Sequence, residues 1–215
     1  MMNSSFSWEL YNKAPIVGIV RGLPIDIVEK IVETYLRAEL FTIEITMNTP
    51  NFSDIIKKLR KDFPNLNVGA GTVCTMKDLH NALDAGSQFI VTPIVDVQVI
   101  EYCVSKGIPI FPGAFTPSEI YKAWSLGATG VKVFPATQLG VQYIKDVLAP
   151  LDMIKLVPTG GVNKDNIAAF FEAGAVGVGM GSSLFNKDLI NSNDFEGLLN
   201  HFKKIKSKIG SFLNN

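Results

Sequence analysis

Short apolar runs rich in valine and isoleucine alternate along the chain with amphipathic stretches. Within a run, successive residues are apolar, a pattern typical of strands buried on both faces of a parallel sheet. The stretches between the runs carry apolar residues three or four positions apart, as Ile27 and Ile31 do, which predicts helices. The runs predict eight strands, at residues 15–20, 41–46, 66–73, 88–93, 108–111, 129–134, 154–157 and 175–180.

The spacing of these strands favours a closed barrel. Eight strand–helix units in 215 residues leave about 27 residues for each unit, close to the smallest unit that a (β/α)8 TIM barrel uses. We therefore expect one domain over residues 1–215, with a short N-terminal helix at 6–12 and a closing helix at 195–212. The same alternation also permits an open, doubly wound sheet, which stays as the alternative.

Glycine marks the joints between the predicted helices and strands. Gly86, Gly107, Gly127 and Gly174 each stand between an amphipathic stretch and the next apolar run. Glycine readily takes the left-handed conformation that ends many helices, so these four residues are expected to be helix caps. Glu39 stands at the corresponding joint before the second run, so that helix should end in another way.

Composition narrows the class of partner. The chain has 20 Lys and Arg and 20 Asp and Glu, so it offers no net field to nucleic acid or to an anionic membrane, and a small-molecule ligand is expected. The sequence predicts neither a leader peptide nor a spanning helix. Cys74 and Cys103 are expected to be buried, reduced thiols, which suggests the cytoplasm. His80 and His201 lack metal-ligand neighbours, so no metal site is predicted.

Two ionisable residues stand inside otherwise apolar strands, Glu44 in the second run and Lys132 in the sixth. A closed barrel gives a lysine in the middle of a strand no edge at which to reach water. Burial lowers the pKa of a lysine and makes its neutral amine available to attack a ketone, while a desolvated carboxylate can move protons at neutral pH. The pair fits Schiff-base chemistry; an ion pair that only completes the core is the alternative.

Further polar residues follow the predicted strands, where barrel enzymes place their sites. Arg21 follows the first strand, Asn48 the second, and Thr72 ends the third. A guanidinium suits a carboxylate or phosphate, although Arg21 could instead be a surface loop residue. Glycines gather at 158–162 and 177–183, after strands seven and eight, where barrels commonly hold phosphate on backbone N–H groups; ordinary tight turns are the alternative.

Seven short motifs occur in order along nearly the whole chain, at six of the strand ends. They are IEIT at 43–46, VGAGTV at 68–73, VTP at 91–93, PG at 112–113, VKVFPA at 131–136, PTGGV at 158–162 and GS at 181–182. Together they resemble the family of 2-dehydro-3-deoxy-phosphogluconate (KDPG) aldolase and 4-hydroxy-2-oxoglutarate (KHG) aldolase.

The resemblance implies a homotrimeric class I aldolase that needs no cofactor, because the lysine itself is the electron sink. It implies that Lys132 forms the Schiff base and that Glu44 is the acid and base. Thr72 and Pro93 would belong to the pyruvyl pocket, and residues 159–161 with Ser182 to the phosphate side. The complete set of expected substrate-binding residues is Arg21, Asn48, Thr72, Pro93, Phe134, Thr159, Gly160, Gly161, Gly181 and Ser182.

The chain departs from the gluconate-type pattern at residues 46–50, which lack the arginine expected soon after Glu44. Its VRG at 20–22, NTP at 48–50 and QYIK at 142–145 are similar to the branch that acts on the 6-phosphogalactonate epimer (KDPGal), whereas PTGG at 158–161 resembles the gluconate type. Both epimers therefore stay candidates, and our hypothesis is that Arg21 replaces the missing arginine.

We expect reversible cleavage of a 2-keto-3-deoxy-6-phospho sugar acid to pyruvate and glyceraldehyde 3-phosphate, with 4-hydroxy-2-oxoglutarate as a second substrate. Two alternatives remain open. A phosphate-binding barrel isomerase or epimerase would share the glycine loops but would need no imine-forming lysine. A non-catalytic sugar-phosphate sensor or scaffold would need neither Lys132 nor Glu44.

Overall fold

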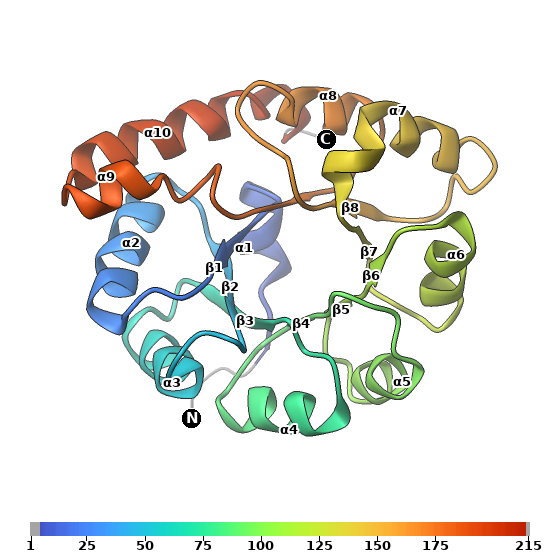
Figure 1. Cartoon of the computed structure of the whole chain (residues 1–215), viewed down its shortest axis with the longest axis horizontal. Helices are drawn as coiled ribbons and strands as arrows, with labels where there is room; N and C mark the ends of the chain where they lie inside the picture. Colours follow the sequence, from blue (N-terminus) through green and yellow to red (C-terminus); the bar gives the residue numbers. More distant parts are fainter. Residues whose placement is uncertain (1–4, 214–215) are drawn as a thin grey trace.

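The computed structural model describes residues 5–213 and shows a ring of parallel strands surrounded by helices (Figure 1). The strand segments are β1 (Ile16–Val20), β2 (Thr42–Thr46), β3 (Asn67–Gly71), β4 (Ile90–Val91), β5 (Ile110–Phe111), β6 (Gly113–Ala114), β7 (Val131–Val133), β8 (Leu156–Pro158) and β9 (Val178–Met180). The helices are α1 (Trp8–Lys13), α2 (Ile25–Arg37), α3 (Phe52–Asp62), α4 (Met76–Asp84), α5 (Val97–Ser105), α6 (Pro117–Ser125), α7 (Ala136–Leu148), α8 (Ile167–Glu172), α9 (Lys187–Asn191) and α10 (Phe195–Ser207), followed by the 3-10 turn η1 (Gly210–Phe212).

The strand order closes the ring, so the (β/α)8 barrel is confirmed and the open sheet is excluded. Six segments pair in the order β5-β4-β3-β2-β1-β9 and three in the order β6-β7-β8, all in parallel. Only Pro112 separates β5 from β6, so these two segments act as one bent strand that joins the sheets. An isolated parallel bridge between Thr159 and Gly179 links the other two edges.

The fifth predicted strand continues further than its apolar run. We predicted residues 108–111, but the pairing continues beyond Pro112 into β6, which lies beside β7. Pro112 has no N–H to donate to a ladder, yet its carbonyl oxygen accepts from the Lys132 N–H at 2.9 Å. The bend therefore keeps the fifth strand bonded to the strand that carries Lys132.

The helix joints follow the glycine pattern. Gly86, Gly107, Gly127 and Gly174 all have positive φ, between +65° and +101°, as expected of helix caps. At the joint without glycine, Glu39 itself adopts the left-handed conformation with φ 56°, and its carboxylate pairs with the Lys206 ammonium.

The short N-terminal helix closes the end of the barrel at which the strands begin. It starts two residues later than the predicted 6–12, because Ser7 is its N-cap and accepts a hydrogen bond from the Leu10 N–H. Phe6 and Tyr11 pack with Phe89 and Phe111 in an apolar cluster at this end of the barrel interior. The opposite end, where the strands finish, stays open to ligands.

The closing helix predicted at 195–212 is present as α10 followed by η1. No helix within residues 5–213 is both long and apolar enough to span a bilayer. Of the two cysteines, Cys103 is buried as predicted, but Cys74 is only partly buried, so that prediction was wrong. Cys74 stands two residues after Thr72, whose positive φ coincides with the end of β3.

Candidate active site

Glu44 and Lys132 face each other across the barrel interior. Glu44 is the middle residue of β2 and Lys132 the middle residue of β7, and both are buried, at 2% and 7% exposure. Both line one interior space of about 10 Å³, together with apolar side chains such as Val17 and Phe111. Because alternate residues of a barrel strand point inward, mid-strand positions on β2 and β7 bring these two charges together from residues 88 positions apart.

Burial moves the pKa values of both groups toward neutrality. Desolvation raises the pKa of the Glu44 carboxyl, an effect that the nearby Lys132 and Arg21 charges oppose. Desolvation lowers the pKa of the Lys132 amine; Glu44 opposes this shift and Arg21 adds to it. The ion pairs of the described residues lie elsewhere and join side chains that are partly or fully exposed. Glu44 and Lys132 therefore influence each other without forming a salt bridge.

A glycine on the neighbouring strand makes room for the Glu44 carboxylate. In the ladder between β2 and β3, Glu44 pairs with Gly69, and Gly71 lies two residues further along β3 on the same face. A methyl group at Gly71 would overlap the Glu44 carboxylate. This role is not among those predicted from the sequence, although a glycine at the end of a strand, as in GAGT, is a visible signal.

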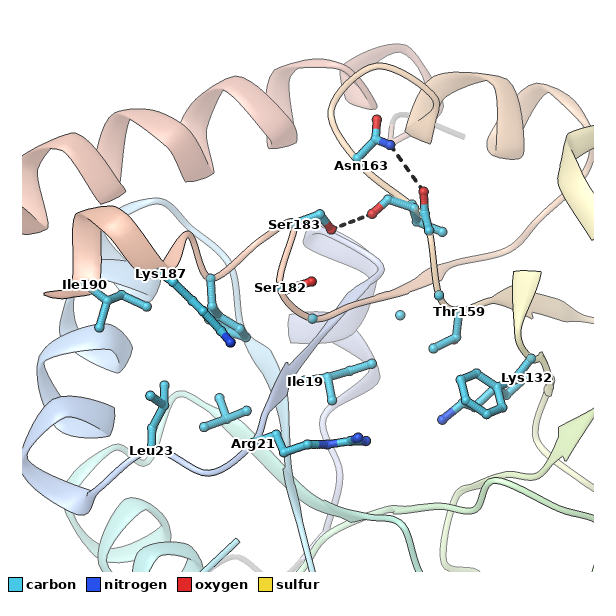
Figure 2. Close-up of a pocket in the computed structure, with 18 of the residues that line it drawn as sticks. Ile19, Arg21, Leu23, Lys132, Thr159, Asn163, Ser182, Ser183, Lys187 and Ile190 are labelled. Carbon is cyan, nitrogen blue, oxygen red and sulfur yellow. Dashed lines mark hydrogen bonds between the residues drawn. The ribbon is translucent and has the colours of Figure 1, made fainter. Parts of the chain in front are cut away.

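Above this pair lies an open cleft of about 720 Å³ at the carboxyl ends of the strands. Lys132 forms part of its floor, and the Lys132 Nζ lies 4.8 Å from the centre of the Phe134 ring. Figure 2 shows Arg21 extending from the end of β1 toward Lys132. The open cleft and the buried pair beneath it form a continuous site, since Lys132, Ile19 and Thr159 line both.

The loop that carries Arg21 rests on the turn after β2. The Gly22 N–H donates to the Thr49 Oγ1 at 3.0 Å, and Thr49 is buried against Thr46. Thr49, rather than the exposed Asn48, is thus the residue of the NTP turn that supports the Arg21 loop.

Two glycine-rich loops form the far wall of the cleft. Thr159, Gly160 and Gly161 follow β8, while Gly181 and Ser182 follow β9. Gly160 and Gly161 both have positive φ, and a side chain at Gly161 would overlap Thr137, so this turn requires glycine.

Hydrogen bonds tie the two loops to each other and to α10. The Ser183 hydroxyl donates to the Val162 carbonyl oxygen, and the Asn163 side-chain amide donates to the Gly161 carbonyl oxygen (Figure 2). The His201 Nε2 lies 2.8 Å from the Ser183 carbonyl oxygen and therefore donates to it. The far wall is a bonded unit rather than two independent turns.

Most of the predicted site residues meet in this cleft and the space beneath it. They are Arg21, Glu44, Lys132, Phe134, Thr159, Gly160, Gly161, Gly181 and Ser182. Asn48, Thr72 and Pro93 do not line the cleft, although they follow β2, β3 and β4 at the same end of the barrel. The backbone of Pro93 lies against Gly113, where a side chain would overlap it. Three further polar residues line the cleft without having been predicted from the sequence: Asn163, Ser183 and Lys187.

Comparison with known proteins agrees with this geometry. Residues 9–200 match the family model described as "Aldolase: KDPG and KHG aldolase". The chain is 33% identical to the 2-dehydro-3-deoxy-6-phosphogalactonate aldolase of Escherichia coli (strain K12) over 80% of its own length and 85% of the relative's. It is 32% identical to the 2-dehydro-3-deoxy-phosphogluconate aldolase of Treponema pallidum (strain Nichols), over 82% and 87%.

A solved structure described as "Native KDPGal structure" superposes with a TM-score of 0.87 at 28% identity, covering 98% of this chain and 100% of that one. This superposition supports the barrel fold, and the family model matches most of the chain. The chain belongs to the KDPG and KHG aldolase family and is a carbon–carbon lyase.

Proposed function

We propose that this protein is a class I aldolase that reversibly cleaves a 2-keto-3-deoxy-6-phospho sugar acid to pyruvate and glyceraldehyde 3-phosphate. The observation that carries the proposal is the buried Lys132 amine, whose pKa is lowered, beside the Glu44 carboxyl, whose pKa is raised, beneath an open cleft. The two groups supply the nucleophile and the proton carrier that the reaction requires, without any cofactor.

The mechanism begins with the neutral Lys132 amine, which attacks the C2 ketone to give a carbinolamine. Loss of water, for which the Glu44 carboxyl supplies the proton, leaves an iminium ion and the Glu44 carboxylate. Glu44 takes the proton of the C4 hydroxyl, directly or through one water, and the C3–C4 bond breaks as its electron pair moves into the iminium to form an enamine. After the aldehyde leaves, Glu44 returns the proton to C3. Hydrolysis of the resulting imine then releases pyruvate and restores the Lys132 amine.

Phe134 supports the charged intermediate. The Lys132 Nζ stands over the face of the ring, where the aromatic quadrupole attracts a cation. The same contact favours the iminium ion on that nitrogen. Phe134 therefore does more than line the cleft, because its ring contacts the Lys132 Nζ, the atom that reacts.

We assign the substrate carboxylate to Arg21, which lies beside Lys132, and the phosphate to the backbone of the two glycine loops with Ser182. Thr72 and Pro93, at the ends of neighbouring strands, are assigned to the pyruvyl end, and Asn48 to the sugar hydroxyls. We expect Arg21→Ala to raise the KM for the phosphorylated substrate and for 4-hydroxy-2-oxoglutarate, since both carry the same carboxylate. Unchanged KM values would remove the assignment of Arg21.

The preference between epimers rests on few residues. Relatives of comparable identity act, by their names, on the gluconate and on the galactonate compound. We propose that this chain accepts both C4 epimers, because it combines the VRG and NTP motifs of one branch with the Thr159 motif of the other. Steady-state assays that couple pyruvate release to its reduction measure the ratio directly; activity on a single epimer would contradict the proposal.

The protein is further proposed to be a cytoplasmic homotrimer. Ile94 and Phe115, which follow the neighbouring segments β4 and β6, and Tyr121 on α6 are exposed apolar side chains. Such side chains are typical of surfaces that a second copy covers. Light scattering after gel filtration should give the mass of three chains, and a mass of one chain would overturn this part of the proposal.

The reaction itself is tested by trapping the imine. Incubation with pyruvate and borohydride should leave a reduced pyruvyl adduct on Lys132, located by mass spectrometry of the digested protein. Lys132→Met should abolish the adduct, whereas Lys57→Met, which removes an exposed lysine on α3, should not. If the folded wild-type protein carries no adduct, the aldolase mechanism is wrong and the isomerase and sensor alternatives return.

A further inference from the structure

A third cation lies in the cleft, at the end opposite Lys132. Lys187 is the first residue of α9, which follows the second glycine loop, and its side chain lines the cleft. Figure 2 shows its amine directed into the cleft, with Ser182 between it and Thr159. Asn186 caps α9 by accepting from the Asp188 and Leu189 N–H groups, and the buried Ile190 anchors the helix. The base of the Lys187 side chain is therefore held in place.

The charged side chains that line the cleft are all positive. Its described lining contains Arg21, Lys132 and Lys187 but no aspartate or glutamate, in a chain whose net charge is zero. Glu44 lies in the space beneath. Within residues 5–213, no carboxylate forms an ion pair with Lys187. A concave surface lined by uncompensated cations favours an anionic ligand.

Lys187 acts at a different place from the other two cations. Arg21 shifts the pKa values of both Glu44 and Lys132, whereas Lys187 is not among the charges that shift either one. Figure 2 shows Lys187 on the side of the cleft opposite Lys132. The groups near it are the loop residues Gly181, Ser182 and Ser183, which offer hydroxyl and backbone donors but no positive charge.

We propose that Lys187 binds the distal phosphate of the substrate and makes this cleft selective for phosphorylated over unphosphorylated 2-keto-3-deoxy sugar acids. The proposal rests on the proposed function. A lysine ammonium acts as a point charge toward phosphate, and its flexible stem follows the oxygen atoms as the aldehyde fragment separates. The backbone donors orient the phosphate, and Lys187 supplies the charge that distinguishes a dianion from a neutral hydroxyl.

The test compares one sugar acid with and without its phosphate. Lys187→Ala should lower kcat/KM for 2-keto-3-deoxy-6-phosphogluconate about 10- to 100-fold, the effect of losing a hydrogen bond to a charged group. It should leave kcat/KM for 2-keto-3-deoxygluconate unchanged. Lys187→Arg should retain most of the selectivity, and Lys57→Ala on α3 is the matched control. Equal losses on both substrates, or no loss on either, would overturn the proposal.

A binding measurement separates this proposal from the proposed function. Calorimetric titration with glyceraldehyde 3-phosphate needs no turnover, and Lys187→Ala should weaken its binding by the same factor while leaving pyruvate trapping on Lys132 intact. Trapping that fails in the wild-type protein counts against the aldolase mechanism. Wild-type trapping combined with unchanged titration in Lys187→Ala counts against Lys187 alone.

Discussion

The carboxylate of Glu44 occupies the space that a side chain at Gly71 would fill. The position of Glu44 on β2 therefore depends on the absence of a side chain at Gly71 on the neighbouring strand β3. The apolar side chains that line the space around Glu44 offer it no hydrogen bond, and the room at Gly71 on β3 is one constraint on where this carboxylate lies.

Gly71→Ala should displace Glu44 and lower kcat about 100-fold, within the range that general acid–base catalysis contributes. Imine trapping should persist, because Lys132 is untouched. Adding Glu44→Gln should cause little further loss, since both changes remove the same proton carrier. Gly210→Ala, which meets nothing within 4 Å, is the control. Additive losses in the double variant would show that Gly71 acts independently of Glu44.

The pH profile of trapping should respond in opposite directions to two substitutions. Trapping requires the neutral amine, so it declines as pH falls through the pKa of Lys132. Glu44 raises that pKa and Arg21 lowers it. Glu44→Gln should therefore shift the midpoint to lower pH and Arg21→Met to higher pH. The measurement is the midpoint of the trapping rate against pH at saturating pyruvate; shifts of the same sign would contradict the proposed electrostatics.

His201 positions the second glycine loop through its hydrogen bond to the Ser183 carbonyl oxygen. His201→Ala should raise the KM for the phosphorylated substrate about two- to tenfold, in line with the loss of one neutral hydrogen bond. The rate of pyruvate trapping should not change, because the loop is remote from Lys132. His80→Ala on α4 is the matched control, and a fall in trapping would assign His201 a wider structural role.

Asn67 fastens the N-terminal segment to the closed end of the barrel. Its side chain accepts from the Ser7 N–H at 2.8 Å and donates to the Ser7 carbonyl oxygen at 2.9 Å. Asn67→Ala should lower the free energy of unfolding by about 1–3 kcal/mol, because buried groups lose their partners. Chemical denaturation measures this, with the exposed Asn81→Ala as reference. KM should stay the same, as the cleft lies at the other end.

The barrel could be predicted because its strands are buried on both faces and so are apolar throughout, but strand ends were less visible. Residues 88–93 are predicted as a strand, whereas β4 spans only Ile90–Val91; at Gln88 the backbone N–H donates to the Val68 carbonyl oxygen, but the Val68 N–H is bonded by the Gln88 side chain rather than by a backbone carbonyl. The third strand ends at Gly71 because Thr72 takes a positive φ, which no apolar pattern reveals. Local backbone geometry, rather than hydrophobicity, decides where these strands stop.

Site residues could be predicted where a charged side chain interrupts an otherwise apolar strand. A charge within an apolar strand identified Glu44 and Lys132. Lys187 gave no such signal, since it is one of 20 cationic residues and begins a polar helix. Only the closure of the ring brings it to the cleft. The glycine in GAGT is visible in the sequence, but its role is not, because Gly71 leaves space for a side chain on another strand.

The isolated bridge between Thr159 and Gly179 makes the junction of β8 and β9 the seam of the barrel. The two loops that rise from either side of this seam are those assigned to the phosphate. A ligand that binds both loops would hold β8 and β9 together. Binding in the cleft should therefore disfavour local opening of the barrel between these two strands. Hydrogen exchange at the amides of β8 and β9 should then slow when phosphate binds. The bound substrate would itself stabilise the part of the barrel that surrounds it.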